Sequence, residues 1–299
     1  MSSEMHFRFA ESVEAATALL HEHPDEARLV CGGTAIAILL RQGLIVPTLL
    51  IGIGRIPALR TTSVDDDGTL HLGAAVRVRE AEVDLRVRPW QALSEALQHV
   101  ATPRIRMMAT IGGGIAHGDP AQDPIIALAA LDARVNVAGA EPHPVPLASF
   151  LRGYYETALA PGEMVVGVEV PRLAERSGSA YLKFLPRSVE DYGTVTAAAV
   201  IALDQFGYVS HARLVLGAVG PKPIVVPVES ILNGGDANDE RLREAAQLAA
   251  SLVDPLHDVR GSAEYKRDMA VVFARRSLEL AYARAWDVHR GIGGERAVT

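Results

Sequence analysis

Cysteine is almost absent from this sequence of 299 residues, in which Cys31 stands alone. A single thiol excludes a disulfide framework within the chain, and it excludes an iron–sulfur cluster or a structural zinc site built from cysteines of this chain. Long hydrophobic runs are absent too, because the apolar stretches 46–53 and 197–203 fall far short of the roughly 20 residues that cross a bilayer. The first residues show no basic segment followed by an apolar run, so we expect a soluble, cytoplasmic protein.

An excess of positive charge is also lacking. The chain has 29 Lys and Arg residues against 36 Asp and Glu residues. Because nucleic-acid-binding domains usually carry a basic field, nucleic acid is not an expected partner. The motifs Gly-x-Ser-x-Gly, His-Glu-x-x-His and the P-loop are missing and the histidines are scattered, so no metal site is predicted.

The residues that are present predict an α+β protein. Hydrophobic residues make up 49% of the chain, enough for a sizeable core, and the length favours two domains or two lobes of one. In the N-terminal half, apolar periodicity predicts strands over 5–9, 28–31, 48–53, 61–64 and 69–75, and helices over 11–23, 35–42, 90–100 and 120–131. We expect 28–31 to be buried, Thr34 to cap the helix after it and Gly43 to end that helix.

The predicted strands become longer towards the C-terminus. Longer strands are predicted over 165–170, 179–185, 195–203 and 209–219, followed by helices over 238–253 and 262–289 with a capped start at Ser262. We therefore expect one domain over 1–177, with lobes of about 1–59 and 60–177, and a second domain over 178–299.

Two glycine clusters, which we interpret as glycine-rich turns, have the setting of a phosphate site. Gly32-Gly33 follows an apolar strand and opens a helix, so free N–H groups can point at a phosphate that approaches without meeting a Cβ. The segment 110–116 adds the Thr110 hydroxyl and consecutive glycine amides, suited to a second wall around a diphosphate. An ordinary turn and a flexible hinge are the alternatives. The clusters at Gly234 and Gly293 lie in polar surroundings typical of turns.

Several polar residues follow the second cluster. Asp119 and Asp123 either accept hydrogen bonds from sugar-like hydroxyls or cap the next helix, and capping by Asp119 is the favoured interpretation. His117 either contacts a phosphate or flavin substituent or lies in an exposed loop. A third pattern, Gly52-x-Gly54, begins like a dinucleotide-binding motif, but Pro57 stands where the third glycine belongs. We interpret it as a strand followed by a turn and exclude a Rossmann site.

Taken together, these motifs resemble the FAD-binding medium subunits of molybdenum hydroxylases, the xanthine dehydrogenase and aerobic carbon monoxide dehydrogenase family. The family's first phosphate loop, Ala-Gly-Gly-Thr-Asp-Leu, is similar to Leu29, Val30, Cys31, Gly32, Gly33, Thr34, Ala35 and Ile36, with Ala35 in place of the usual Asp. The second motif, Thr-Ile-Gly-Gly-Asn-Ile, is similar to Thr110, Ile111, Gly112, Gly113 and Gly114, with Gly114 in place of Asn and Asp123 as the acidic residue expected near the flavin's sugar-like chain.

The resemblance extends along nearly the whole chain. The segment 162–171 looks like a family strand that would place Val165 against the cofactor, and Lys183 with Asp191 looks like a Lys-x7-Asp pattern that the family brings to the isoalloxazine ring. Tyr192 would then lie by the flavin. The segment 264–278 resembles the closing helix of these subunits.

The resemblance implies a two-lobed FAD-binding domain of the PCMH (vanillyl-alcohol oxidase-like) type, followed by a C-terminal domain of antiparallel sheet and helices. It implies non-covalent FAD, with molybdenum–pterin in a large partner subunit and 2Fe-2S clusters in a small one, as a dimer of heterotrimers. Electrons would pass from the clusters through FAD to quinone, NAD or oxygen, and no catalytic acid or base is needed. The substrate would be chosen in the large subunit, so neither it nor the acceptor can be read from this chain.

Two alternatives remain at this point. One is a stand-alone flavin-dependent reductase or oxidase of the same FAD-binding fold. The other is a flavin-free scaffold subunit, motivated by Ala35 and Gly114.

Overall fold

The computed structural model describes residues 5–185 and 192–291, which form two compact units. Unit 1 comprises 1–86, 102–119 and 133–170, and unit 2 comprises 87–101, 120–132 and 171–299. Each unit therefore collects segments from several parts of the chain. Among the described residues, no helix has the length and apolar character needed to cross a membrane.

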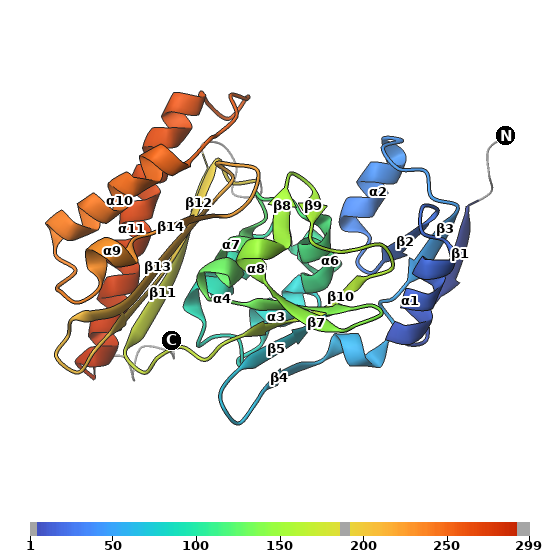
Figure 1. The fold of residues 1–299 in the computed structure, drawn as a ribbon, viewed down its shortest axis with the longest axis horizontal. Coiled ribbons are helices and arrows are strands. Elements are labelled where there is room, and N and C mark those ends of the chain that lie inside the picture. Colours follow the sequence, from blue (N-terminus) through green and yellow to red (C-terminus); the bar gives the residue numbers. More distant parts are fainter. Residues whose placement is uncertain (1–4, 186–191, 292–299) are drawn as a thin grey trace. The chain divides into compact units, whose positions relative to one another are not determined.

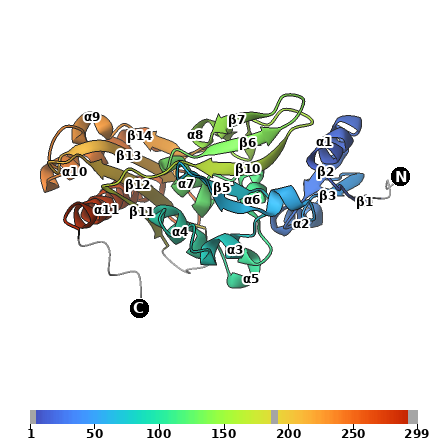
Figure 2. The ribbon, with the colours of Figure 1, turned by 90° about the horizontal axis from the view of Figure 1, so that it is seen from below.

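The first part of unit 1 is a small parallel sheet with the strand order β1-β3-β2, with helices α1 and α2 beside it (Figures 1 and 2). Only Ala27 of β2 is buried, so the prediction of a buried strand was wrong; β2 is an edge strand, whereas the central β3 is buried throughout. The predicted ending of α2 at Gly43, which has a φ of +68°, is confirmed. These elements are β1 His6–Phe9, α1 Val13–Glu22, β2 Ala27–Val30, α2 Thr34–Arg41 and β3 Leu49–Gly52.

A five-stranded antiparallel sheet with the order β4-β5-β10-β6-β7 forms the rest of unit 1. The strands predicted over 61–64 and 69–75 are confirmed as β4 and β5, which pair as a hairpin around Gly68, whose φ of +88° suits a tight turn. A short 3-10 helix follows β3 where a Rossmann fold would need a long helix, in agreement with the rejected motif. The elements are η1 Pro57–Arg60, β4 Thr62–Val64, β5 Leu70–Gly73, α3 Val78–Val83, α5 Pro103–Arg106, α6 Ile111–His117, β6 Arg134–Ala138, β7 His143–Pro146, α8 Leu147–Phe150, β8 Leu151–Gly153, β9 Glu156–Thr157 and β10 Met164–Val170.

Three local predictions were wrong, each at a place where the structure has the start of a helix. The second glycine cluster is not a turn but the first turn of α6, because Thr110 is its N-cap and its Oγ1 accepts from the amide of Gly113 at 3.3 Å. Gly33, in the left-handed region with a φ of +74°, replaces Thr34 as the N-cap of α2. Gln122 occupies the N-cap of the helix after Pro120, so Asp119 does not cap it.

Unit 2 is a four-stranded antiparallel sheet, β11-β12-β13-β14, with helices on both faces. The predicted strand 195–203 is confirmed as β12, and all its residues are buried, as a continuous apolar run requires. Helices α9, α10 and α11 pack on one face, and α4 and α7 contact the other; Figure 1 shows α11 running along the sheet. The elements are α4 Gln91–Gln98, α7 Asp123–Ala130, β11 Ser177–Phe184, β12 Val195–Leu203, β13 Val209–Gly217, β14 Ile224–Val226, α9 Glu229–Leu232, α10 Asp239–Leu252 and α11 Ala263–His289.

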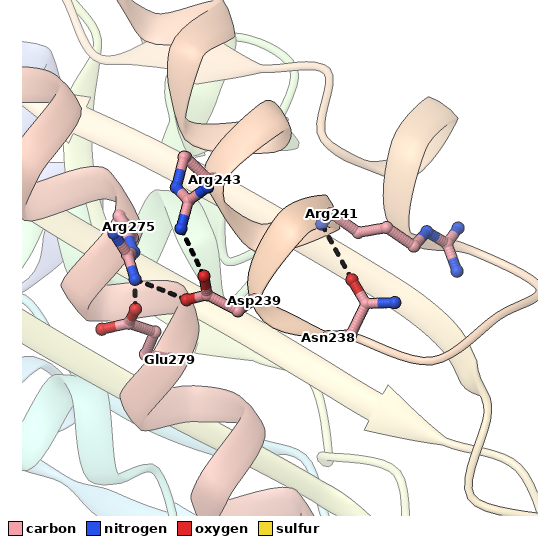
Figure 3. Close-up of polar contacts among 6 residues, drawn as sticks. All are labelled: Asn238, Asp239, Arg241, Arg243, Arg275 and Glu279. Atoms are coloured by element: carbon pink, nitrogen blue, oxygen red, sulfur yellow. Dashed lines mark hydrogen bonds and ion pairs between the residues drawn. The ribbon is translucent and has the colours of Figure 1, made fainter.

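The start of α10 is tied to α11 by charged side chains (Figure 3). Asn238 caps α10, with its Oδ1 accepting a backbone amide at 3.0 Å. Asp239 pairs with Arg243 on its own helix and with Arg275 of α11, whose Nη2 lies 2.5 Å from the Asp239 Oδ1. Arg275 also binds Glu279 at 2.7 Å. The predicted cap of α11 is confirmed as well, since Ser262 accepts from the amide three residues on.

Candidate functional site

The first glycine turn leaves a row of backbone donors open. After β2 the chain turns at Gly32, and Gly33 starts α2 in a left-handed conformation that other residues adopt at a cost. Within the described part of the chain, the amides of residues 32–36 donate to no protein acceptor. A Cβ on Gly32 would lie 2.1 Å from the carbonyl oxygen of Met108, so only glycine fits there.

These open amides fit a diphosphate. The first N–H groups of a helix carry the positive end of its dipole, and anions bind there through the backbone. Residues 31–36 are all partly exposed, so a ligand can reach them. The turn therefore has the donors and the access that the diphosphate of FAD requires.

The second glycine cluster is built differently. The amides of Ile111 and Gly112 donate to the carbonyls of Val76 and Ala74 at 3.0 and 2.9 Å, and those of Gly113 and Gly114 donate to Thr110. Gly112 is needed for packing, since a Cβ there would lie 2.4 Å from the Cβ of Ala74. Ligand binding by residues 110–114 stays a prediction, and it would use groups other than these amides.

A cavity of about 210 Å³ in unit 1 brings the two predicted motifs together. Cys31 and Gly32 line it from the first turn and Thr110 from the second, and Arg77 pairs with Thr110 through an isolated β-bridge. The complete lining is Cys31, Gly32, Gly54, Arg60, Ala75, Arg77, Met107, Met108 and Thr110. No sequence motif marks Arg60 or Arg77, so neither residue was predicted to belong to the site.

The single thiol lies at this cavity. Burial raises the pKa of Cys31, while a hydrogen bond with Thr110 and the charges of Arg60 and Arg77 act in the opposite direction. A thiol with a raised pKa is a weak nucleophile, so Cys31 serves as a small lining group.

His117 and Val165 lie elsewhere in unit 1. His117 is in the last turn of α6, where its ring packs against Tyr155 with the centroids 5.1 Å apart. Burial lowers the pKa of His117, and Asp119 opposes this effect. Val165 is 4% exposed and pairs with Val137 in the five-stranded sheet. Contact of either residue with the cofactor stays a prediction.

A buried polar network occupies unit 2. Strand alternation points Ser179, Tyr181 and Lys183 of β11 to the face that α4 and α7 cover. The Tyr181 hydroxyl donates to the Oδ1 of Asp123 at 2.5 Å, and the Lys183 ammonium donates to its Oδ2 at 3.0 Å and to the carbonyl of His99 at 3.0 Å. The Lys183 side chain is only 1% exposed and that of Asp123 only 7%, so the structure brings these two predicted residues together as a buried ion pair.

Burial dominates the electrostatics of this network. It raises the pKa of the Asp123 carboxyl, while the Lys183 ammonium opposes the rise. Burial and the charge of Asp123 raise the pKa of Tyr181 well above its ordinary value, so Tyr181 stays a hydrogen-bond donor. The sequence offered no hint of Tyr181 beyond the strand alternation that places it beside Lys183.

A second set of contacts anchors the network. Glu95 of α4 accepts from the amide of Tyr181 at 2.8 Å and pairs with Arg284 of α11, which also donates to the carbonyl of Ser179 at 2.6 Å. The amide of Ala92 donates to the Ser179 hydroxyl at 3.1 Å. Helices on both faces of the sheet are thereby tied to β11.

Comparison with known proteins decides the family. Residues 3–173 match the model of the FAD binding domain in molybdopterin dehydrogenase, and residues 180–281 match that of the CO dehydrogenase flavoprotein C-terminal domain. The chain belongs to the FAD-binding medium subunits of molybdenum hydroxylases. The expected fold is confirmed with it: a PCMH-type FAD-binding domain and a C-terminal domain of antiparallel sheet and helices.

Individual medium subunits are similar to this chain over nearly their whole length. The alpha subunit of the 6-hydroxypseudooxynicotine dehydrogenase complex of Paenarthrobacter nicotinovorans is 34% identical, with 92% of this chain and 94% of the relative covered. The carbon monoxide dehydrogenase medium chain of Hydrogenophaga pseudoflava is also 34% identical, over 92% of this chain and 96% of its own. In a solved structure of carbon monoxide dehydrogenase from Hydrogenophaga pseudoflava, the matching chain superposes with a TM-score of 0.90 at 33% identity, covering 95% of this chain and 99% of that one.

Two predicted cofactor contacts of this medium subunit lie in or beside 186–191. Asp191 lies outside the described residues. Tyr192 is 47% exposed, and the Arg260 guanidinium lies 5.9 Å from its ring centroid. The proximity of Tyr192 to the flavin stays a prediction.

Proposed function

We propose that this medium subunit is the electron-transfer subunit of a molybdenum-containing dehydrogenase, receiving electrons from 2Fe-2S clusters of a small partner subunit and delivering them to an external acceptor. When bound, the isoalloxazine ring of FAD supplies the redox chemistry that couples one-electron centres to two-electron acceptors. The family supports a large molybdenum-binding partner, because relatives are named as medium chains or complex subunits. A dimer of heterotrimers, a quinone, NAD or oxygen acceptor and a cytoplasmic location belong to the same proposal.

The observation that carries the proposal is the first glycine turn. Open amides at residues 32–36, a left-handed Gly33 and partial exposure support binding of the FAD diphosphate at this turn. This chain's own task is then to hold and orient the cofactor. In the same proposal, Asp123, Lys183 and Tyr192 lie near the ribityl chain and the ring.

Gly33→Val tests the cofactor site. The new Cβ would meet only the Val30 side chain, at 3.9 Å, so the cost to folding is the backbone strain of a φ of +74°, which the control variant shares. The valine side chain would cover the amides proposed to bind the diphosphate. Gly43→Val is the matched control, because Gly43 has a similar φ of +68° at the other end of α2 with nothing within 4 Å of a Cβ. We expect FAD content to collapse in Gly33→Val and to stay normal in Gly43→Val. Equal FAD content in the two variants would contradict the site.

Native purification tests the electron-transfer role. The tagged chain should co-purify with molybdenum, iron and FAD, and substrate of the complex should bleach the flavin absorbance only when both partner subunits are present. A yellow chain that purifies alone and turns over a substrate by itself would instead support the stand-alone reductase or oxidase.

A further inference from the structure

Two arginines outside the glycine motifs face the same cavity as the first turn. Arg60 ends the 3-10 helix after β3, and Arg77 precedes α3. Both line the 210 Å³ cavity together with Cys31, Gly32 and Thr110. The lining contains no carboxylate, although the chain as a whole is acidic with a net charge of -7. The cavity is therefore a local concentration of positive charge beside the open amides.

Arg77 is the stronger of the two candidates for an external anion. Within the described residues, its guanidinium has no hydrogen bond or ion pair, and its hydrogen bonds are made by the backbone, whose amide donates to Glu80 at 2.9 Å and whose carbonyl accepts from the amide of Ala81 at 3.0 Å. In the part of the chain that the structure describes, the ion pair of Arg60 is a long contact of 3.8 Å with Glu80, and both side chains are nearly half exposed. Such a pair contributes little, so Arg60 can turn to a ligand at small cost.

The size of the cavity limits what it can hold. Sites that enclose a whole small molecule measure about 300 to 1,000 Å³, so a cavity of 210 Å³ suits one polar portion of a ligand. Guanidinium groups match phosphate oxygens through paired hydrogen bonds, and backbone amides add to the same anion. A diphosphate meets both requirements.

We propose that Arg60 and Arg77 bind the diphosphate of FAD together with the first glycine turn, and so make this chain select FAD over flavins that lack a diphosphate. The inference rests on the proposed function, because it takes FAD as the ligand of the turn. The arginines supply the charge that offsets the diphosphate, whereas the amides position it. Ala35 stands where the family usually has Asp, so no carboxylate at this position competes with the diphosphate for the arginines.

Flavin affinities of the full chain, stripped of cofactor, test the proposal. Dissociation constants for FAD, FMN and riboflavin are compared in the wild type, Arg60→Ala, Arg77→Ala and the double variant. Loss of a charge-assisted hydrogen bond should weaken FAD binding roughly 10- to 100-fold per arginine, with FMN affected less and riboflavin unaffected. Arg77→Lys should retain part of the affinity, because it keeps the charge but not the paired geometry.

Arg79→Ala is the matched control. Arg77 is the N-cap of α3, and Arg79 lies two residues further along in the same helix. Arg79 pairs with Glu82 at 2.8 Å and does not line the cavity. FAD affinity should be unchanged in this variant. An affinity loss as large as that of Arg77→Ala would show that any charge on α3 suffices, and would overturn the proposal.

Further outcomes separate the possible failures. The proposal is overturned if the double variant binds FAD within twofold of the wild type, or if FAD and riboflavin weaken equally. ADP should compete with FAD; arginine-dependent binding of ADP to the FAD-saturated chain would show a separate anion site and overturn the proposal too. A wild-type chain that binds no FAD would instead refute the proposed function.

Discussion

Neutralising one member of the buried Lys183 and Asp123 pair should destabilise unit 2 strongly, whereas neutralising both should cost little. The two side chains are 1% and 7% exposed, and their atoms lie 3.0 Å apart. Removing one partner leaves a buried charge without its counter-ion, which costs about 3 to 5 kcal/mol. We therefore expect losses of that size in Lys183→Met and in Asp123→Asn.

The double variant should recover most of the loss. With both charges gone, the Tyr181 hydroxyl can still donate to the Asn oxygen, and the remaining cost should stay below about 2 kcal/mol. The coupling energy from the cycle should thus exceed about 4 kcal/mol in favour of the pair. The exposed Asp239 and Arg243 pair is the control, because side chains that are 60% and 56% exposed should couple by about 1 kcal/mol or less.

Chemical denaturation followed by tryptophan fluorescence suits this cycle. Both tryptophans, Trp90 and Trp286, lie in unit 2, and Trp90 is buried with its indole N–H donating to the carbonyl of Pro171 at 2.8 Å. FAD-free protein is used, so that ligand binding does not change the apparent stability. Additive losses in the double variant would refute the assignment of a buried ion pair.

The pH dependence of Lys183→Met gives a second measurement of the same pair. Burial raises the pKa of Asp123, and without the ammonium only the Tyr181 hydrogen bond and the charge of His99 oppose the rise, so the pKa lies further above the unfolded value than in the wild type. A raised folded-state pKa contributes stability at low pH, and that contribution is lost as pH rises through the folded-state pKa. The variant should therefore be closer to the wild type in mildly acidic solution than at neutral pH, and the opposite trend would refute the reasoning.

Two further predictions concern other parts of the chain. Gly112→Ala should lower the free energy of unfolding by about 1 to 3 kcal/mol, because its Cβ would lie 2.4 Å from that of Ala74; an unchanged denaturation midpoint would contradict this packing. Burial raises the pKa of Asp258, but hydrogen bonds and charges from Lys266 and Arg260 together lower it below the ordinary value of 3.8. The stabilising effect of this carboxylate is therefore present above 3.8 and is lost as pH falls through the lowered pKa. Asp258→Asn should flatten the acid side of the stability profile, and an unchanged slope would show that the pair does not contribute.

Local signals were sufficient for many elements. The continuous apolar run 195–203 and the cap at Ser262 identified β12 and the start of α11, because a buried strand and a capped helix each leave a pattern within a few residues. The prediction of a turn at 110–117 was wrong because it also depended on a local pattern alone. Three consecutive glycines favour a turn by propensity, but tertiary bonds to the carbonyls of Ala74 and Val76, together with the Thr110 cap, stabilise a helix there.

The sequence by itself determined the α+β class, the family through ordered motifs, and the glycine turn at residues 32–34, because each depends on residue type and short spacing. Only the tertiary structure decided which amides are open, that Arg60 and Arg77 share a cavity with Cys31, and that Lys183 forms a buried ion pair with Asp123. These properties arise between segments far apart in the chain. Burial and hydrogen-bond satisfaction depend on which residues pack against a side chain, and a local sequence pattern does not identify neighbours that come from distant segments.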